Sequence, residues 1–322
     1  MIPSSARDSR RIRGLFDFQV NGFGGIDFQR DDLTLGEFQY ALKALEYHGV
    51  ARIFATLITD EVNHLCHRLA RMEEFCAADR NVAMMIAGYH LEGPWLSAES
   101  GFCGAHPPEW MHPPSGLEYG RLQAAAGGRI RLVTLAPEWP GSVEFIAALH
   151  ASGVHVAIGH TNASESQIDE AVAAGARFCT HLGNGVPQML PRHDNVVQRL
   201  LARDELVACF IPDGMHLPPF VLRNFVRAKP EGRVLFTTDA MAGAGAPVGA
   251  YSLGRLKIEI GQDGVARQPG GAGFAGSTLT PDEGVRHTAQ ILGISLVRAQ
   301  HLWSEAPASA FGVKLSDENE FE

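Results

Sequence analysis

Stretches rich in apolar and β-branched residues alternate with helix-patterned stretches along most of this chain, and this alternation limits the possible folds. Strands are expected at residues 14–20, 51–58, 84–92, 130–136, 154–158, 177–179, 207–211 and 234–238. Helices are expected between them at residues 34–48, 61–78, 115–126, 142–151, 164–174 and 219–228. Eight strands alternating with helices over 322 residues predict an α/β fold, a (β/α)8 TIM-type barrel.

The regular pattern stops after the eighth strand. The stretch Leu253–Gln268 alternates around Asp263-Gly264, which predicts a β-hairpin. Residues 281–292 and 297–311 then have the spacing of closing helices. Because no low-complexity tract or linker interrupts the chain, we expect one barrel domain over residues 1–322, with a small hairpin excursion at about residues 251–268.

Composition narrows the partners and the cellular location. With 45% hydrophobic and 20% charged residues, the chain is globular and can bury a sizeable core. A net charge of −9 gives no broad attraction to nucleic acid or to an anionic membrane, and we expect neither partner. The N-terminus has no apolar signal core, no apolar run could span a bilayer, and the five cysteines form no CxxC pair. We therefore expect a cytoplasmic protein with reduced thiols.

Candidate metal ligands follow three of the expected strands. Residues 154–184 form a βαβ unit, so the strands that end near His160 and His181 should be parallel neighbours. Two imidazoles placed in this way can share one metal ion. On the third strand, the period-two alternation sends His90 and Glu92 to the same side. Barrel enzymes place their catalytic groups at these C-terminal strand ends.

These residue types together indicate hydrolytic chemistry. Glu92, His160 and His181, with one position left for water, make the ligand set of a hydrolytic zinc site. Asp239, at the end of the eighth strand, could take a proton from that water and pass it to a leaving amine. Each residue also has an ordinary structural interpretation. The two histidines could be polar residues of the rim, the glutamate a salt-bridged surface residue and the aspartate a helix cap. The coincidence of all four residues at one rim favours the metal site.

Six short motifs in order carry a resemblance to a known family. They are HLEGPW, GHTNAS, THLGN, PDGMH, TTDAM and AGSTLT. Together, over residues 14–312, they resemble the N-acetylglucosamine-6-phosphate deacetylases of the amidohydrolase superfamily. The resemblance implies that Glu92, His160 and His181 bind the metal and that Asp239 is the acid/base. The implied reaction converts N-acetylglucosamine 6-phosphate to glucosamine 6-phosphate and acetate. The residues implied to hold the sugar phosphate are His106, Asn184, Gly185, Arg192 and His216.

The resemblance also implies an assembly and a metal count. Arg192 matches an arginine that reaches across a dimer interface to the neighbour's phosphate, so we expect a homodimer. Many amidohydrolases carry His-x-His on the first strand, whereas this chain has Gln19-Val20-Asn21. Because amides are poor zinc ligands, we expect a single divalent ion, Zn²⁺, and we place Gln19 on the substrate side. Phe274 stands where the family more often has leucine, so an aromatic ring is expected beside the acyl group.

The chain departs from the family pattern outside the barrel. The family usually adds a β-sandwich, which we expect here to be missing or reduced to the Leu253–Gln268 hairpin. Two alternative functions stay open: another amidohydrolase that acts on a different N-acyl sugar or a cyclic amide, and a non-catalytic barrel that binds a sugar phosphate. The phosphate-side residues Arg192 and His216 favour the deacetylase over the first alternative. The intact acid/base Asp239 argues against the second.

Overall fold

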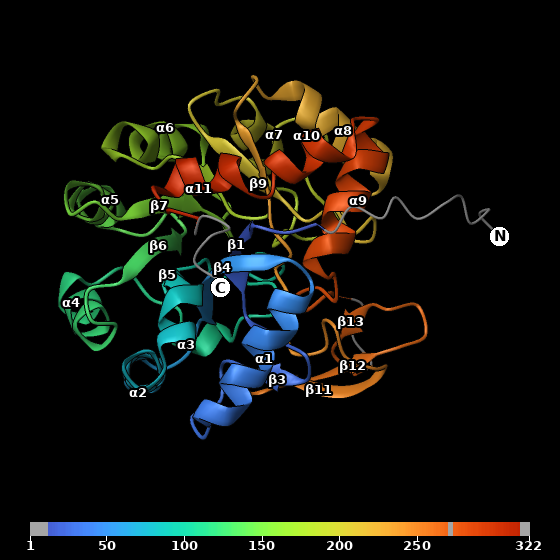
Figure 1. Ribbon diagram of the computed structural model, residues 1–322. Coiled ribbons are helices and arrows are strands. Elements are labelled where there is room, and N and C mark those ends of the chain that lie inside the picture. Colours follow the sequence, from blue (N-terminus) through green and yellow to red (C-terminus); the bar gives the residue numbers. More distant parts are fainter. Residues whose placement is uncertain (1–11, 270–272, 316–322) are drawn as a thin grey trace.

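The computed structural model describes residues 12–269 and 273–315 of the chain. The two ends of the domain expected over residues 1–322 therefore lie outside the described residues. Eight parallel strands form one sheet in sequence order, which curls into a barrel and confirms the predicted (β/α)8 fold (Figure 1). The strands are β1 (Leu15–Val20), β4 (Val50–Ile58), β5 (Ile86–Glu92), β6 (Ile130–Leu135), β7 (His155–Ile158), β8 (Phe178–Cys179), β9 (Val207–Phe210) and β10 (Val234–Phe236).

Helices surround the barrel between successive strands (Figure 1). They are α1 (Leu35–Tyr47), α2 (Val62–Ala78), α3 (Arg80–Met85), α4 (Gly116–Ala125), α5 (Ser142–Ala151), α6 (Glu165–Ala174), α7 (Val196–Leu201) and α8 (Pro219–Ala228). Local signals fix several ends: Thr34 and Ser164 form capping boxes at the starts of α1 and α6, and Gly175 ends α6. None of the described helices is long and apolar enough to cross a membrane.

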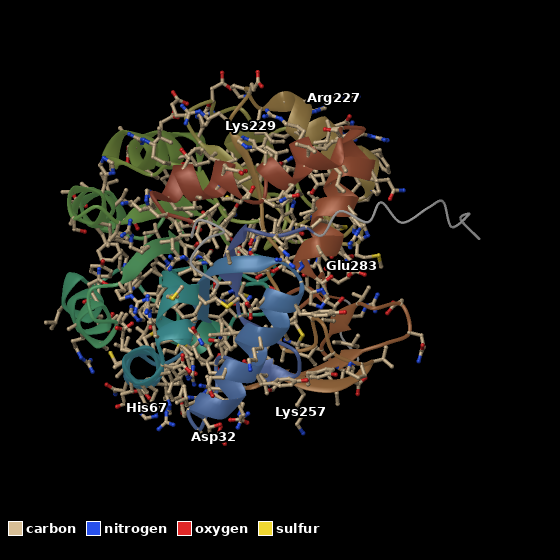
Figure 2. All side chains as sticks on the ribbon, in the orientation of Figure 1. Asp32, His67, Arg227, Lys229, Lys257 and Glu283 are labelled. Atoms are coloured by element: carbon tan, nitrogen blue, oxygen red, sulfur yellow. The ribbon has the colours of Figure 1, made fainter. Side chains whose placement is uncertain are left out.

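Two short α-helices and one short 3-10 helix, η1 (Pro108–Trp110), were not predicted from the sequence. Asp79 caps α3 by accepting from the amides of Asn81 and Val82. This extra turn moves the start of β5 to Ile86, two residues beyond the expected strand start. The second, α7, has only six residues after a long loop, which is too short for a clear helical period. Charged side chains lie on the outside of the molecule, as Asp32, Arg227 and Lys257 show (Figure 2).

The N-terminal end of the barrel is closed by the last helices. The expected helix over residues 297–311 is instead two helices, α10 (Leu296–His301) and α11 (Glu305–Phe311). The break occurs because Trp303 is fully buried, with its indole N–H donating to Thr288 at 3.0 Å, and because the backbone of Ser304 is not helical. The ring of Phe311 contacts the rings of Phe16, Phe18, Phe54 and Phe178. This aromatic cluster fills the N-terminal end of the barrel, and the opposite, C-terminal end is the one that can hold a site.

The excursion after β10 is larger than the expected hairpin. It is a three-stranded antiparallel sheet of β11 (Gly249–Leu253), β12 (Leu256–Ile260) and β13 (Ala266–Arg267), which α9 (Pro281–Leu292) follows. The Asp263-Gly264 turn joins β12 to β13, and a tighter turn at Gly254-Arg255 adds the unpredicted strand β11. Asp27, on the small hairpin of β2 (Gly22–Phe23) and β3 (Ile26–Asp27), accepts bonds from Ser252 and Gly254 at 2.9 Å. These bonds dock the excursion on the barrel.

Candidate active site

A cavity of about 760 Å³ opens where the barrel strands end. This volume is typical of a small-molecule site. Most of the site residues predicted from the sequence line it, namely Glu92, His106, His160, His181, Asn184, Gly185, His216, Asp239 and Phe274. Gln19 and Arg192 are not among the lining residues.

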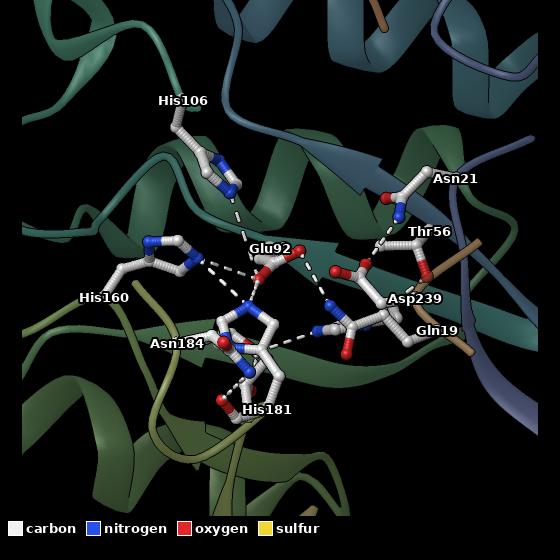
Figure 3. A network of polar contacts seen from close by, with 12 residues as sticks. Gln19, Asn21, Thr56, Glu92, His106, His160, His181, Asn184 and Asp239 are labelled. Atoms are coloured by element: carbon white, nitrogen blue, oxygen red, sulfur yellow. Dashed lines mark hydrogen bonds and ion pairs between the residues drawn. The ribbon is translucent and has the colours of Figure 1, made fainter. Parts of the chain in front are cut away.

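The centre of the site is a carboxylate on which two imidazoles converge (Figure 3). Glu92 Oε1 lies 3.0 Å from His181 Nε2 and 3.3 Å from His160 Nε2, and the two Nε2 atoms are 3.1 Å apart. Glu92 ends β5, whereas His160 and His181 lie two residues beyond the ends of β7 and β8, respectively. All three side chains are at most 6% exposed. The structure therefore brings together the three residues predicted to bind a metal.

Three residues at this rim have an unusual backbone conformation. His160, His181 and Asp239 have φ values of 49°, 27° and 51°, and they are the non-glycine residues with positive φ in the described chain. Such a conformation costs about 1–3 kcal/mol at each residue. Each follows a barrel strand, so the sharp change of direction turns its side chain toward the mouth of the barrel. Backbone strain is therefore concentrated at the functional positions.

The ring of His160 is fixed from several sides. Its Nδ1 lies 2.9 Å from the carbonyl oxygen of Phe102, and a carbonyl can only accept, so Nδ1 carries the proton. A Cβ atom on Gly104 or Gly185 would lie 2.7 Å from an atom of this ring. Only glycine therefore fits at these two positions. The other ring nitrogen, Nε2, faces the carboxylate of Glu92 at 3.3 Å, in the position of a metal ligand oriented by a backbone carbonyl.

This donor set fits a divalent metal ion. Burial raises the pKa of Glu92, but hydrogen bonds from His160 and His181 outweigh it and hold that pKa well below its usual range. An ionised carboxylate oxygen and two imidazole nitrogens thus point at one another, an arrangement that a cation between them stabilises. His106 Nε2 lies 3.9 Å from Glu92 Oε1, and His106, Glu92 and His160 form a buried group whose possible ligand atoms lie within 4.8 Å of one another. Burial lowers the pKa of His106 to about 3, so its ring is neutral.

The side-chain amides of Gln19, on β1, and Asn21, just after β1, hold the two carboxylates of the site (Figure 3). Gln19 Nε2 donates to Glu92 Oε2 at 3.1 Å, and Asn21 Nδ2 donates to Asp239 Oδ1 at 2.8 Å. Asp239 is 8% exposed. Burial, followed by the negative charge of Glu92, raises the pKa of Asp239 to about 7. A carboxyl with this pKa can both accept and return a proton near neutral pH.

The remaining predicted residues lie at the sides of the cavity. Asn184 donates to the carbonyl of His181 at 3.1 Å. His216 Nδ1 lies 2.6 Å from Asp213 Oδ2, and the ring of His216 is 4.8 Å from the ring of Phe274. Arg192 lies on an exposed part of the loop between β8 and α7. No lysine or arginine is among the described residues that line the cavity, so its walls offer a phosphate only neutral donors and histidines.

Some residues of the site were not assigned a role from the sequence. Asn21 was considered only as a poor metal ligand, although period-two alternation places Asp17, Gln19 and Asn21 on one side of β1. This alternation is the sequence signal from which the position of Asn21 in the site could have been predicted. His90 points into the barrel, where its Nε2 lies 2.8 Å from Thr134 Oγ1, and burial lowers its pKa to about 4. His90 therefore lies beneath the site as a neutral ring.

A (β/α)8 barrel with a buried Glu–His–His cluster and an aspartate at its C-terminal rim defines an amidohydrolase. No protein-family model matches the chain. The chain is 37% identical over 318 residues to N-acetylglucosamine-6-phosphate deacetylase of Danio rerio, covering 93% of this chain and 75% of the relative. It is 32% identical over 297 residues to N-acetylgalactosamine-6-phosphate deacetylase of Escherichia coli O157:H7, covering 92% and 77%. The chain belongs to the N-acetylglucosamine-6-phosphate deacetylase family.

A solved structure agrees with this assignment. The N-acetyl-D-glucosamine-6-phosphate deacetylase of Mycobacterium smegmatis, as a mutant bound to N-acetyl-D-glucosamine 6-phosphate, superposes with a TM-score of 0.84. The two chains are 33% identical, and the match covers 94% of this chain and 78% of that enzyme. The resemblance stated from the six sequence motifs is thereby confirmed.

Proposed function

We propose that this chain hydrolyses the N-acetyl group of N-acetylglucosamine 6-phosphate to give glucosamine 6-phosphate and acetate, a step of amino-sugar metabolism in the cytoplasm. The observation that carries the proposal is the convergence of Glu92, His160 and His181 within 3.3 Å of one another. The family membership of the chain supplies the substrate class. Bound substrate in the related Mycobacterium smegmatis enzyme supports the same assignment.

Glu92, His160 and His181 are the residues that would hold one divalent ion, which we propose is Zn²⁺. Such an ion lowers the pKa of water and polarises an acyl carbonyl. Gln19 occupies the second oxygen of Glu92, so a single oxygen faces the two imidazoles. With amides at Gln19 and Asn21 where two histidines could hold another ion, we propose one metal per chain.

Asp239 is the proposed acid/base. It accepts a proton from the attacking water and then delivers that proton to the amide nitrogen, which is a poor leaving group until it is protonated. The bond from Asn21 occupies Oδ1 and leaves Oδ2 for this transfer. Burial raises the pKa of Asp239, which makes its carboxylate more basic and better able to accept the proton that it then returns.

The phosphate side of the proposal includes a homodimer. His106, Asn184, Gly185 and His216 line the cavity, whereas Arg192 is exposed and does not. A dianionic phosphate is best bound by a guanidinium, and the described cavity lining has none. We propose that Arg192 serves the phosphate of a neighbouring copy and that Phe274 shapes the acyl side, whereas Gln19 acts through its bond to Glu92.

N-acetylgalactosamine 6-phosphate is the second candidate substrate. The relative from Escherichia coli O157:H7 carries that name at 32% identity, close to the 37% of the Danio rerio relative. The two sugars differ only in the orientation of one hydroxyl group. A single misplaced hydroxyl can leave a buried polar partner unpaired and thus lower kcat/KM strongly.

Acetate release tests the proposal. Purified protein with Zn²⁺ is given N-acetylglucosamine 6-phosphate, N-acetylgalactosamine 6-phosphate and unphosphorylated N-acetylglucosamine, with Asp239→Asn protein as the blank. We expect the first substrate to have the highest kcat/KM. The Arg192→Ala variant should raise KM for the phosphorylated sugar and leave the rate with the unphosphorylated sugar unchanged. Acetate release from none of the three sugars by folded, metal-loaded protein would refute the proposal.

A further inference from the structure

The barrel has a seam between its first and last strands. Neighbouring strands elsewhere are joined by parallel ladders, but β1 and β10 are not paired as strands. In the described chain, the end of β1 meets the segment that follows β10 through one isolated bridge between Val20 and Ala240. There the amide of Asn21 also donates to the carbonyl of Ala240 at 2.8 Å. Because few backbone bonds cross here, side chains must hold the seam.

Asp17 on β1 makes most of these side-chain contacts. Its Oδ1 accepts from the hydroxyl of Thr237 at 2.5 Å, and its Oδ2 accepts from the hydroxyl of Thr238 at 2.6 Å. The backbone amide of Thr238 points at both oxygens, at 3.3 and 3.4 Å. Asp17 is 0% exposed, and burial raises its pKa despite these bonds. A buried carboxylate is costly, and an apolar contact could join two strands without that cost.

The residues bonded to Asp17 directly precede the proposed acid/base. Asp239 has a φ of 51°, a conformation that persists only where its surroundings enforce it. The amide of Ser277 donates to the carbonyl of Asp239 itself at 2.9 Å. Asn21 holds the side chain of Asp239, and the amide of Ala240 donates to Thr238 Oγ1 at 3.0 Å. On the N-terminal side of Asp239, the Asp17 carboxylate fixes Thr238.

We propose that Asp17 is a positioning residue for amide hydrolysis: by fixing Thr237 and Thr238 across the seam, it fixes the backbone turn that aims Asp239 at the substrate. This inference rests on the proposed function, because it needs Asp239 to move a proton in the reaction. The carboxylate of Asp17 lies outside the cavity lining, yet the inference gives it an effect on kcat. Asp17 itself does not touch the substrate.

The first experiment compares Asp17→Ala and Asp17→Asn with the natural chain in the acetate-release assay. Misplacing a catalytic group by about 1 Å costs on the order of a hundredfold in rate. We therefore expect Asp17→Ala to lower kcat by about ten- to a hundredfold, with KM within about twofold and metal content unchanged. Asp17→Asn keeps one acceptor oxygen for one threonine hydroxyl. Its NH2 group can donate to the other threonine hydroxyl once that hydroxyl has rotated to accept. The loss of kcat in Asp17→Asn should be smaller.

A double-mutant cycle separates positioning from general weakening of the fold. If Asp17 acts through Asp239, adding Asp17→Ala to the Asp239→Asn chain should leave the residual kcat unchanged. The Asp282→Asn chain is a control for loss of a partly buried carboxylate elsewhere, since Asp282 pairs with His48 and Arg286 between helices. It should keep the natural kcat. If Asp17→Ala does not fold, Asp17→Asn and Thr238→Val carry the same comparison.

The outcomes are distinguishable from failure of the proposed function. Loss of turnover in Asp239→Asn with metal retained upholds the acid/base role, and the cycle then judges Asp17 alone. An unchanged kcat in folded Asp17→Ala, or an equal fold-loss in the natural and Asp239→Asn backgrounds, would overturn the inference. If the natural chain prefers another amide, the cycle is run on that amide. Normal turnover in Asp239→Asn would overturn the acid/base role and the positioning role together.

Discussion

At the scale of the residue, the chemistry depends most on the carboxyl of Asp239. Asp239→Asn keeps the size of the side chain but removes its basicity. We expect kcat to fall by about two orders of magnitude or more, with metal content and substrate affinity retained, as is usual when a general acid–base is lost. Turnover is measured by acetate release and affinity by calorimetry. Near-normal turnover with metal bound would remove Asp239 from the mechanism.

The pH dependence provides a second test of the same residue. Burial and the charge of Glu92 raise the pKa of Asp239 to about 7, and a divalent cation nearby lowers it again because positive charge favours the ionised carboxylate. The base form is lost as pH falls, so kcat/KM should decline on the acid side with a limb below pH 7. The residual activity of Asp239→Asn should lack that limb.

Residue types at strand ends were predictable, but their partners were not. Period-two alternation and the βαβ spacing predicted that Glu92, His160 and His181 meet at one rim. The carbonyl that sets the tautomer of His160 belongs to Phe102, in a loop without regular structure. No local pattern indicates where such a loop folds back. The same holds for the bond from Asn21 to Asp239, which joins residues 218 positions apart.

At the scale of the element, α9 is tied to α1 by a hydrogen-bonded contact between Asp282 and His48. Asp282 Oδ1 lies 2.7 Å from Nδ1 of His48, which caps the end of α1, and its Oδ2 lies 2.6 Å from Arg286 Nη1. Burial raises the pKa of Asp282, but bonds with His48, Arg286 and Thr280 outweigh it and hold that pKa well below its usual range. The contact therefore stabilises the fold only while Asp282 is ionised.

We expect Asp282→Asn to lower the free energy of unfolding by about 1 kcal/mol at neutral pH, as for a partly exposed ion pair with hydrogen bonds. A depressed pKa in the folded state adds stability above the unfolded value, about 3.9, and loses it as pH falls through the folded value. The difference between the two chains should thus be full at pH 6 and shrink below pH 4. Urea unfolding midpoints measure it.

The control for this comparison is Asp32→Asn, which removes an ion pair with Arg30 at the molecular surface (Figure 2). Its side chain is 80% exposed, so solvent screens the pair and the midpoint should not move. A midpoint for Asp282→Asn that equals the natural value at every pH would show that the contact between α1 and α9 adds nothing to stability.

Elements with strong local signals were predicted closely. The helices α1, α5, α6 and α8 and the strand β4 lie within one or two residues of their expected ranges, because caps, periodicity and apolar runs mark them. The misses were elements too short for a clear period, such as α3 and α7, or elements whose bounds depend on packing and pairing that no periodicity marks. Burial of Trp303 divides the closing helix, and pairing with β12 creates the strand β11.

At the scale of the whole molecule, the two ends of the barrel have separate tasks. The rings around Phe311 pack the N-terminal end, and the cavity occupies the other. Alternation along the chain predicted this barrel because each strand–helix unit is local. The seam between β1 and β10 was not predictable in detail, since its side-chain bonds join the first strand to the last.

A zinc titration of acetate release tests the central proposal most directly. Protein stripped with a chelator is given N-acetylglucosamine 6-phosphate and increasing Zn²⁺. Three protein ligands make one site, so turnover should rise from background and reach its plateau at one equivalent per chain. Full turnover by the stripped protein, or a plateau reached only at two equivalents, would contradict the single metal site of Glu92, His160 and His181.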